Sequence, residues 1–293
     1  MLTFRSLWQR LTPLYDDHEA AAIVRLVLET RFTMTYTDIV CGGIDSLTDE
    51  NKQELETFMH RLETGEPVQY VLGEAQFMGR TFHIEPGVLI PRPETAELCQ
   101  WIIGQNRPAC DILDIGCGSG CIGVTLAAEL STAHVSAWDV SETALRLTAE
   151  NAHRLGTTVC TRRQDALQTP PDERCWDVIV SNPPYICMKE QADMEPNVLD
   201  HEPSLALFVP DDDPLLFYRA IARYAYRALR PGGKLYFEIN PIYAQETLEM
   251  LQTEGFGQAE IRNDELGKKR MICCKAPAAS LQRPNSTAAK PRQ

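Results

Sequence analysis

The stretch Asp111–Gly120, which reads Asp-Ile-Leu-Asp-Ile-Gly-Cys-Gly-Ser-Gly, predicts a buried strand that runs directly into a glycine-rich turn. Its three glycines, Gly116, Gly118 and Gly120, let the backbone turn tightly and approach a bound molecule closely. A helical stretch from Cys121 to Leu130 follows, and the first N–H groups of such a helix are free to meet a ligand. The spacing is Gly-x-Gly-x-Gly, whereas dinucleotide-binding folds use Gly-x-Gly-x-x-Gly. We therefore predict a loop that binds a nucleoside.

Strand-like and helical stretches alternate downstream of this turn. The predicted strands are 134–139, 159–163, 177–181, 234–239, 259–262 and 270–275. The predicted helices are 142–155, 214–229 and 244–253, and residues 186–213 are predicted as a loop rich in Asp, Glu and Pro. Alternation of this kind predicts an α/β fold with a doubly wound, mostly parallel sheet. Ligands of such sheets bind beyond the C-terminal ends of the strands.

Two acids lie at predicted strand ends. Asp139 ends the second strand about 20 residues after the glycine turn, a position from which an acid accepts hydrogen bonds from ribose hydroxyls. Asp165, followed by Ala166, closes the next strand in the same way. We expect both acids on the same rim as Gly116–Gly120.

The strand 177–181 stops in Asn182-Pro183-Pro184-Tyr185. Two prolines remove two N–H donors and lock φ, and the residue before a proline is extended, which directs the Asn182 side chain off the strand end. The Asn182 carboxamide oxygen and the Pro183 carbonyl oxygen are two acceptors without a competing donor, and Tyr185 adds a flat face. This arrangement suits a planar –NH2 group, so we predict methyl transfer to a planar nitrogen.

Residues 1–72 predict a helical bundle that binds a partner. Two apolar faces repeat at helical spacing, one made of Ile23, Leu26, Val27 and Thr30 and the other of Leu55, Phe58, Met59 and Leu62. Thr48 is the expected N-cap of the second helix.

Residues 73–93 predict a β-hairpin linker, with short strands at 75–77 and 81–84. Leu89–Thr95 then leads into a helix over 96–104, and we interpret its prolines and acid as ordinary helix-start chemistry. The second domain is expected to span 94–275. Residues 276–293 contain Lys and Arg but no acids, and they predict a disordered tail.

Composition narrows the class of protein. The chain has 293 residues and a net charge of −13, which repels phosphate backbones and weighs against nucleic acid as the main partner. The ten cysteines form no Cys-x-x-Cys pair, so we read them as small buried hydrophobes and expect no metal site. The N-terminus lacks the layout of a signal peptide, and no apolar run approaches the length of a membrane span. We expect a cytoplasmic monomer.

Together, Leu113–Gly120, Asp139 and Asn182–Tyr185 resemble the class I, seven-stranded S-adenosylmethionine-dependent methyltransferases that modify exocyclic or amide nitrogens. Four further stretches are similar to the HemK/PrmC family, the protein-(glutamine-N5) methyltransferases of class I peptide chain release factors. They are Glu66–Tyr70, Leu89–Thr95, Ile179–Ile186 and Glu202–Leu207. This resemblance covers about residues 48–275.

The resemblance implies a Rossmann-like, mostly parallel seven-stranded sheet, an N-terminal all-helical domain and a β-hairpin linker. It implies that S-adenosyl-L-methionine is the cofactor and that a release factor is the protein substrate, methylated on the glutamine of its Gly-Gly-Gln loop. The expected cofactor-binding residues are Gly116, Cys117, Gly118, Ser119, Gly120, Asp139, Asp165, Ala166 and Asn182. The expected catalytic residues are Asn182, Pro183 and Tyr185, and the expected substrate-binding residues are Asn182, Pro183, Pro184 and Tyr185.

The chain departs from the family pattern at three places. Ala166 stands where a bulky residue is common, Glu238–Pro241 replaces a Glu-x-Gly, and Asp213-Pro214 replaces an Asp-Gly. We expect neither Glu238–Pro241 nor Asp213-Pro214 to touch the reaction.

Three alternative functions stay open at this point. The same tetrapeptide suits an exocyclic amino group of a flipped base in DNA or RNA. The target glutamine can also belong to a ribosomal protein. A dinucleotide-dependent oxidoreductase or a non-catalytic nucleotide-binding module is the third alternative, and the glycine spacing disfavours it.

Overall fold

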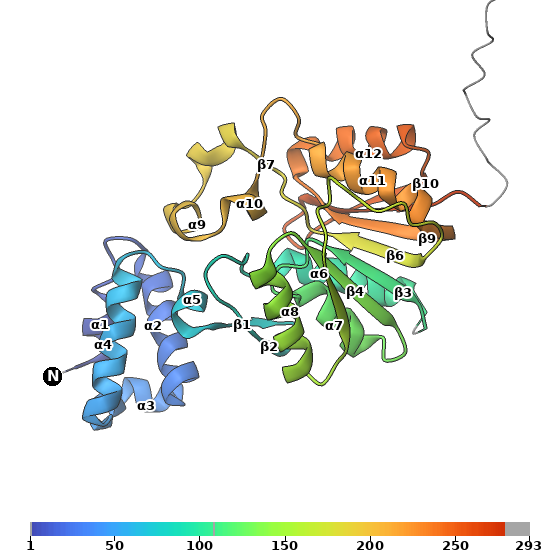
Figure 1. Ribbon diagram of the computed structural model, residues 1–293. Helices are drawn as coiled ribbons and strands as arrows, with labels where there is room; N and C mark the ends of the chain where they lie inside the picture. Colours follow the sequence, from blue (N-terminus) through green and yellow to red (C-terminus); the bar gives the residue numbers. More distant parts are fainter. Residues whose placement is uncertain (1, 108, 279–293) are drawn as a thin grey trace, which may run out of the picture.

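The computed structural model describes residues 2–107 and 109–278. In Figure 1 a small group of N-terminal helices joins a larger α/β part through a short hairpin. The predicted tail from 279 onward lies outside the described residues. Its expected beginning, Ala276, is buried and donates a backbone hydrogen bond to Gly233, so the α/β part extends at least to that residue.

The N-terminal helices share one apolar core. They are α1 (Phe4–Trp8), α2 (Asp17–Phe32), α3 (Tyr36–Val40), the short 3-10 helix η1 (Gly43–Ser46), α4 (Asp49–Glu63) and α5 (Val68–Leu72). Thr48 caps α4 by accepting from the Asn51 N–H, which confirms that prediction.

The predicted face of α2 is partly wrong. Its fully buried side chains are those of Ala20, Val24, Val27 and Leu28, whereas Thr30 is exposed. Two apolar stripes overlap along this helix, and packing against α1 and α5 selects the one that is buried.

The hairpin pairs β1 (Glu74–Phe77) with β2 (Arg80–His83) in antiparallel register. Met78 and Gly79 both have positive φ, as the two central residues of a type I′ turn require. Asn151 on α8 (Glu142–Arg154) binds both the N–H and the C=O of His83, at 2.7 and 3.0 Å. These two hydrogen bonds fasten β2 to the α/β part.

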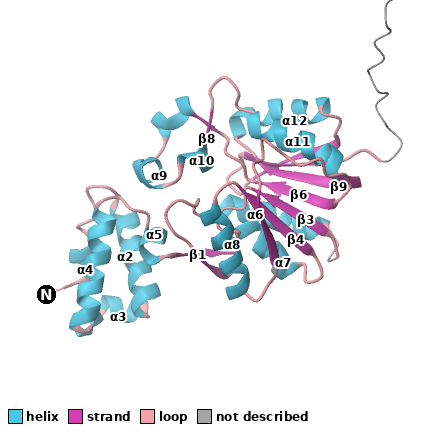
Figure 2. Cartoon of the chain, viewed as in Figure 1, coloured by secondary structure: helices cyan, strands magenta, loops and turns pink. Residues whose placement is uncertain are grey.

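The α/β part is built on a seven-stranded sheet (Figure 2), in the order β10-β11-β9-β6-β3-β4-β5. Its strands are β3 (Asp111–Ile115), β4 (His134–Asp139), β5 (Val159–Arg163), β6 (Trp176–Ser181), β9 (Leu229–Glu238), β10 (Gly257–Asn263) and β11 (Lys269–Lys275). Strands β5, β4, β3, β6 and β9 are parallel, and β11 runs antiparallel to both of its neighbours. The predicted mostly parallel α/β sheet is therefore confirmed.

Helices cover both faces of the sheet. Alternate residues of one strand point to opposite faces, so Val178 and Val180 of β6 join the core under α6 (Pro93–Gln105) and α7 (Cys121–Glu129). Ile179 joins the opposite core, under α11 (Leu216–Ala228) and α12 (Ala244–Thr253). No helix in the two described ranges combines the length and the apolar character that a bilayer crossing requires.

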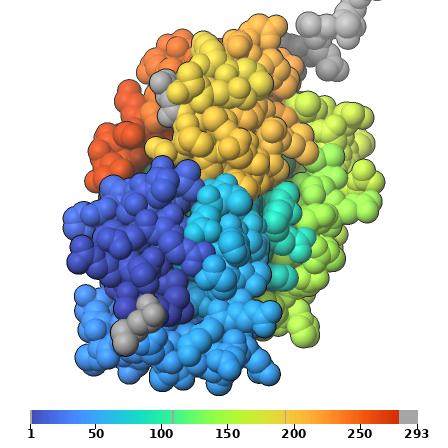
Figure 3. Space-filling model, turned by 90° about the vertical axis from the view of Figure 1, so that its left-hand side faces the viewer, coloured from blue at the N-terminus to red at the C-terminus, as the bar shows by residue number. Residues whose placement is uncertain are grey.

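The segment 186–213, predicted as a loop, is more structured than expected. It contains β7 (Ile186–Cys187), η2 (Met188–Asp193), α9 (Pro196–His201), α10 (Ser204–Leu207) and β8 (Phe208–Val209). A further short 3-10 helix, η3 (Pro241–Tyr243), lies outside this segment and follows β9. Strands β7 and β8 pair with each other, and the Tyr185 N–H donates to the Leu207 carbonyl. Figure 3 shows this segment, in yellow, beside the blue N-terminal helices. Elements this short carry too few residues for a periodic signal, which is why the sequence did not reveal them.

We predict that alanine substitutions at two glycines of the turn after β3 will differ in cost. Gly116 (φ +76°) and Gly120 (φ +81°) are both left-handed, so alanine costs about 1–2 kcal/mol at either position. A Cβ at Gly116 meets nothing within 4 Å, whereas one at Gly120 lies 3.1 Å from the Cα of Thr148. Urea unfolding is expected to show the larger loss of unfolding free energy in Gly120→Ala. Equal losses in the two variants would contradict this packing.

Candidate active site

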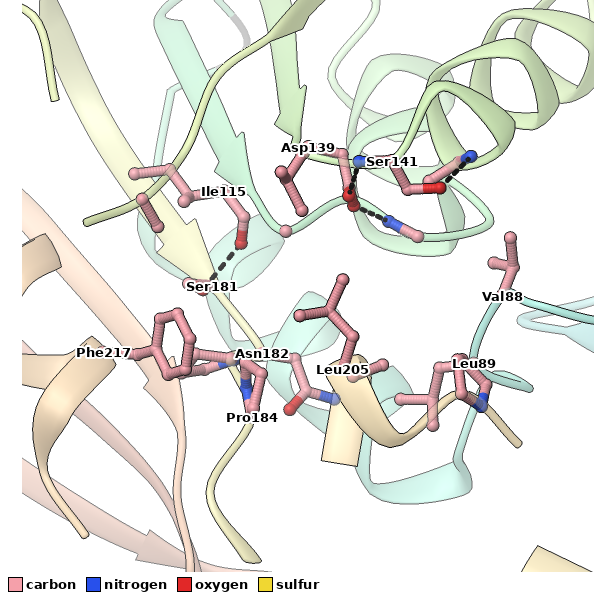
Figure 4. Close-up of a pocket in the computed structure, with 18 of the residues that line it drawn as sticks. Val88, Leu89, Ile115, Asp139, Ser141, Ser181, Asn182, Pro184, Leu205 and Phe217 are labelled. Carbon is pink, nitrogen blue, oxygen red and sulfur yellow. Dashed lines mark hydrogen bonds between the residues drawn. The ribbon is translucent and has the colours of Figure 1, made fainter. Parts of the chain in front are cut away.

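A cavity of about 170 Å³ lies at the C-terminal ends of β3, β4 and β6. Its lining includes eight of the predicted site residues: Gly116, Gly118, Asp139, Asp165, Ala166, Asn182, Pro183 and Pro184. We call it the first cavity, and Figure 4 shows part of its lining. The neighbouring turn residues Cys117, Ser119 and Gly120 do not line it, and the side chains of Cys117 and Ser119 are buried.

The glycine turn is tied to the end of β4. The N–H groups of Gly116 and Cys117 both donate to the Trp138 carbonyl, at 2.8 and 3.0 Å. The N–H of the next residue, Gly118, donates to Asp139 Oδ2 at 3.0 Å. Backbone hydrogen bonds therefore set the distance between the turn and the acid.

Asp139 is held by two backbone donors. Besides Gly118, the Ser141 N–H donates to Oδ1 at 2.9 Å, and both contacts are drawn in Figure 4. Burial raises the pKa of Asp139, and these backbone hydrogen bonds partly oppose that rise. Each carboxylate oxygen has more than one lone-pair site, so both oxygens can accept a further hydrogen bond from a ligand.

Asp165 turns toward its own loop. Its oxygens accept from the Leu167 N–H at 2.8 Å and from Gln168 Nε2 at 3.1 Å. The adjacent Ala166 is half-buried and belongs, with Phe217 and Ile221 of α11, to the apolar part of the lining. Such a wall suits a flat, apolar ring face.

A second cavity, of about 230 Å³, adjoins the first. Both cavities are lined by Leu89, Asn182 and Ala206, so these residues form a shared wall. Among the described residues, no donor binds the carboxamide oxygen of Asn182 or the carbonyl oxygen of Pro183. Asn182 is partly exposed and lines both cavities, whereas Pro183 is buried and lines the first cavity alone.

Tyr185 lines the second cavity and not the first. Its hydroxyl donates to Glu238 Oε1 at 3.1 Å, and burial is the main cause of a raised pKa at Tyr185. Glu238, which we expected to stay clear of the reaction, also lines this cavity. The carboxylate sits at the end of the strand next to β6, a neighbourhood that only the sheet order reveals. Asp213, in contrast, pairs with Arg219 and lines neither cavity.

Two segments to which the sequence analysis gave no role in the site close it from outside the sheet. Arg92, just before α6, binds Glu202 Oε1 at 2.5 Å, and Glu202 Oε2 accepts from the Ile90 N–H at 3.2 Å. This contact holds α10 so that Leu205 lies beside Asn182 and Leu89 (Figure 4), although residue Leu205 is 64% exposed. The similarity motifs at 89–95 and 202–207 were the available signal, but their pairing required the structure.

Asp114 is a buried acid directly below the glycine turn. Its Oδ2 accepts from the Gly123 N–H at 2.9 Å, whereas Oδ1 has no partner among the described residues. Burial raises the pKa of Asp114 to about 7, and the nearby charge of Asp139 acts in the same direction. The charged form of Asp114 is therefore costly in the folded protein.

Comparisons with known proteins agree on one family. The family model "PrmC N-terminal domain" matches residues 6–73, and the model "Methyltransferase small domain" matches residues 101–201. A release factor glutamine methyltransferase of Bacteroides thetaiotaomicron is 45% identical over 265 residues, which cover 90% of this chain and 95% of that protein. The protein of the same description in Flavobacterium psychrophilum is 40% identical, with 90% and 94% covered.

A solved structure shares the fold. The crystal structure of a methyltransferase from Pyrococcus furiosus superposes with a TM-score of 0.51 at 17% sequence identity, covering 68% of this chain and 90% of that one. At this identity the likeness extends to the fold alone.

We predict that Asp114→Asn will stabilise the protein more at pH 8 than at pH 5. The folded-state pKa of Asp114 lies above its unfolded value, so the folded protein holds an extra proton and loses stability as the pH rises from the ordinary value of 3.8 to about 7. Asparagine has the same shape and no charge, so it removes this loss. Urea unfolding of both proteins at the two pH values measures it, with Asp212→Asn, at an exposed acid, as the control. A stability difference that shrinks with rising pH would contradict the prediction.

Proposed function

Because the chain belongs to the release factor glutamine methyltransferase family, we propose that it methylates the side-chain amide N5 of the glutamine in the Gly-Gly-Gln motif of class I peptide chain release factors. The methyl donor in this proposal is S-adenosyl-L-methionine. The observation that carries the proposal is the position of Asn182, which lines both cavities and presents an oxygen without a partner in the described part of the chain.

The residues of the first cavity fit this cofactor. S-adenosylmethionine supplies a methyl group already activated on a sulfonium sulfur. Asp139 offers two carboxylate oxygens with room for ribose hydroxyls, and Gly116 and Gly118 let the backbone come close. Ala166, Phe217 and Ile221 form the apolar surface for the base. The charge of Asp139 is satisfied by N–H groups and not by a cation, so it stays available to the ligand.

The substrate amide would enter the second cavity and reach the shared wall. A carboxamide nitrogen is a weak nucleophile, since its lone pair is delocalised into the carbonyl, so the protein must chiefly orient it. In this proposal Asn182 Oδ1 and the Pro183 carbonyl oxygen accept the two N–H groups. As positive charge grows on the nitrogen, these two hydrogen bonds strengthen, which lowers the barrier. The methyl–sulfur bond would break as the methyl–nitrogen bond forms, and the nitrogen would then give one proton to water. Tyr185 walls the cavity, with its hydroxyl held by Glu238.

In this proposal the N-terminal helices form the domain that binds the partner protein. We assign residues 1–72 to contact with the release factor, 73–93 to the linker and 94–275 to the transfer reaction. The support is that α9 lies near the N-terminal helices (Figure 1), where Asn197 interacts with Tyr15 of the N-terminal part. A protein substrate that reaches the second cavity therefore meets both parts.

The direct test uses purified protein, methyl-labelled S-adenosylmethionine and a class I release factor. Mass spectrometry of the Gly-Gly-Gln peptide is expected to show one added methyl group on the glutamine. A release factor with alanine in place of that glutamine is the matched control and should stay unlabelled. Label that enters ribosomal proteins, DNA or RNA and spares the release factor would refute the proposal in favour of an alternative target.

We predict that Asn182→Ala lowers turnover by more than about 100-fold, because one of the two acceptors that bind the transition state is lost. The affinity for S-adenosylmethionine should stay within about threefold of the wild-type value, since Asn182 is one of many residues that line the first cavity and its truncation removes few contacts there. Steady-state kinetics and calorimetric titration measure the two effects separately. Wild-type turnover in this variant would remove Asn182 from the reaction.

Asp139→Ala is the matched control, because it changes the opposite side of the first cavity. It is expected to weaken cofactor binding by about 1.5–3 kcal/mol through the loss of charge-assisted hydrogen bonds. Unchanged cofactor affinity in this variant would remove Asp139 from the binding site.

A further inference from the structure

Asn182 has one side-chain partner among the described residues, and that partner is Thr95. The Nδ2 atom of Asn182 lies 3.4 Å from Thr95 Oγ1. Thr95 belongs to the first turn of α6 and is 2% exposed, and it lines neither cavity. The two residues are 87 positions apart in the chain, so tertiary packing alone brings them together.

The hydroxyl of Thr95 has a single proton, which it donates in a hydrogen bond to Glu238. Thr95 Oγ1 donates to Glu238 Oε2 at 2.6 Å, and Tyr185 donates to the other carboxylate oxygen at 3.1 Å. Glu238 is 1% exposed, and a buried carboxylate depends on such donors. With Glu238 ionised, the Thr95 hydroxyl faces Asn182 with a lone pair.

The hydrogen bond from Thr95 to Glu238 decides which end of the Asn182 carboxamide faces α6. The Nδ2 group can donate to the lone pair of Thr95 Oγ1. Asn182 Oδ1 in the same place would form no hydrogen bond, because both oxygens would then be acceptors. With Nδ2 turned to Thr95, Oδ1 points away from α6 and remains without a partner in the described chain. We propose that Thr95, held by Glu238, is a positioning residue that fixes the Asn182 carboxamide with its oxygen toward the substrate amide.

The proposal deepens the proposed function and rests on it. The terminal torsion of an asparagine is broad and roughly two-fold, so without Thr95 the carboxamide is free to turn over. The turned-over form presents an –NH2 group to the –NH2 group of the substrate, donor against donor. Turnover would then fall while the first cavity, which Thr95 does not line, keeps its affinity for the methyl donor.

Three variants test the proposal. Thr95→Val keeps the shape and removes the hydroxyl, and it is expected to lower kcat on the release factor at least about tenfold, since misplaced reacting groups cost this much or more. Affinity for S-adenosylmethionine should be unchanged. Thr95→Ser keeps the hydroxyl and should retain most of the wild-type kcat. Thr125→Val is the matched control, because Thr125 is equally buried and its hydroxyl has no partner among the described residues.

The outcomes separate the two proposals. Wild-type kcat in Thr95→Val, or an equal loss in Thr95→Val and Thr95→Ser, overturns the positioning role. A wild-type protein that leaves the release factor unmethylated refutes the proposed function instead, and the orientation is then decided by a measurement without substrate.

That measurement follows the side-chain amide protons of Asn182 by NMR in asparagine-labelled wild-type protein, with the signal assigned by its loss in Asn182→Asp. One Nδ2 proton is expected to exchange with solvent more slowly than those of the exposed Asn263, and faster in Thr95→Val than in Thr95→Ser. Wild-type Asn182 protons that exchange as fast as those of Asn263 overturn the proposal, even if Thr95→Val does not fold.

Discussion

The site depends on the register of three parallel strands. Ile115 of β3 pairs with Trp138 of β4 on one side and with Ser181 of β6 on the other. The residues that follow, Gly116, Asp139 and Asn182, therefore leave the sheet side by side at one edge. Backbone hydrogen bonds set this arrangement, so the Cα positions of these three residues are fixed by the sheet.

Buried acids around this edge are satisfied by neutral donors. Asp139 accepts from two N–H groups, Asp114 from one, and Glu238 from the hydroxyls of Thr95 and Tyr185. No Lys or Arg side chain makes a hydrogen bond to these carboxylates among the described residues, and burial raises the pKa of Glu238 despite the hydroxyl donors and the charge of Arg270. Burial raises the pKa of all three acids, and the neutral donors partly oppose that rise.

The elements that could be predicted from the sequence are those with a periodic pattern of apolar residues. Strands 134–139 and 159–163 and helix 244–253 were predicted with the bounds that the structure shows, because each has a clear apolar pattern between turn residues. Helix α6 begins at Pro93 and not at residue 96, since proline is compatible with the first helical turn. The segment 186–213 was missed as structure, because its elements span only two to six residues each.

The sequence by itself determined the type of each rim residue: glycines for a close turn, an acid at a strand end, and an Asn-Pro-Pro-Tyr run that leaves two acceptors without competing donors. Local chemistry sufficed there, because φ restriction and missing N–H groups act within a few residues. Only the tertiary structure decided that Thr95 and Glu238, 143 positions apart, meet beneath Asn182, and that Arg92 and Glu202 hold α10 over the cavities. Such contacts depend on sheet order and helix packing, which no local pattern of residues specifies.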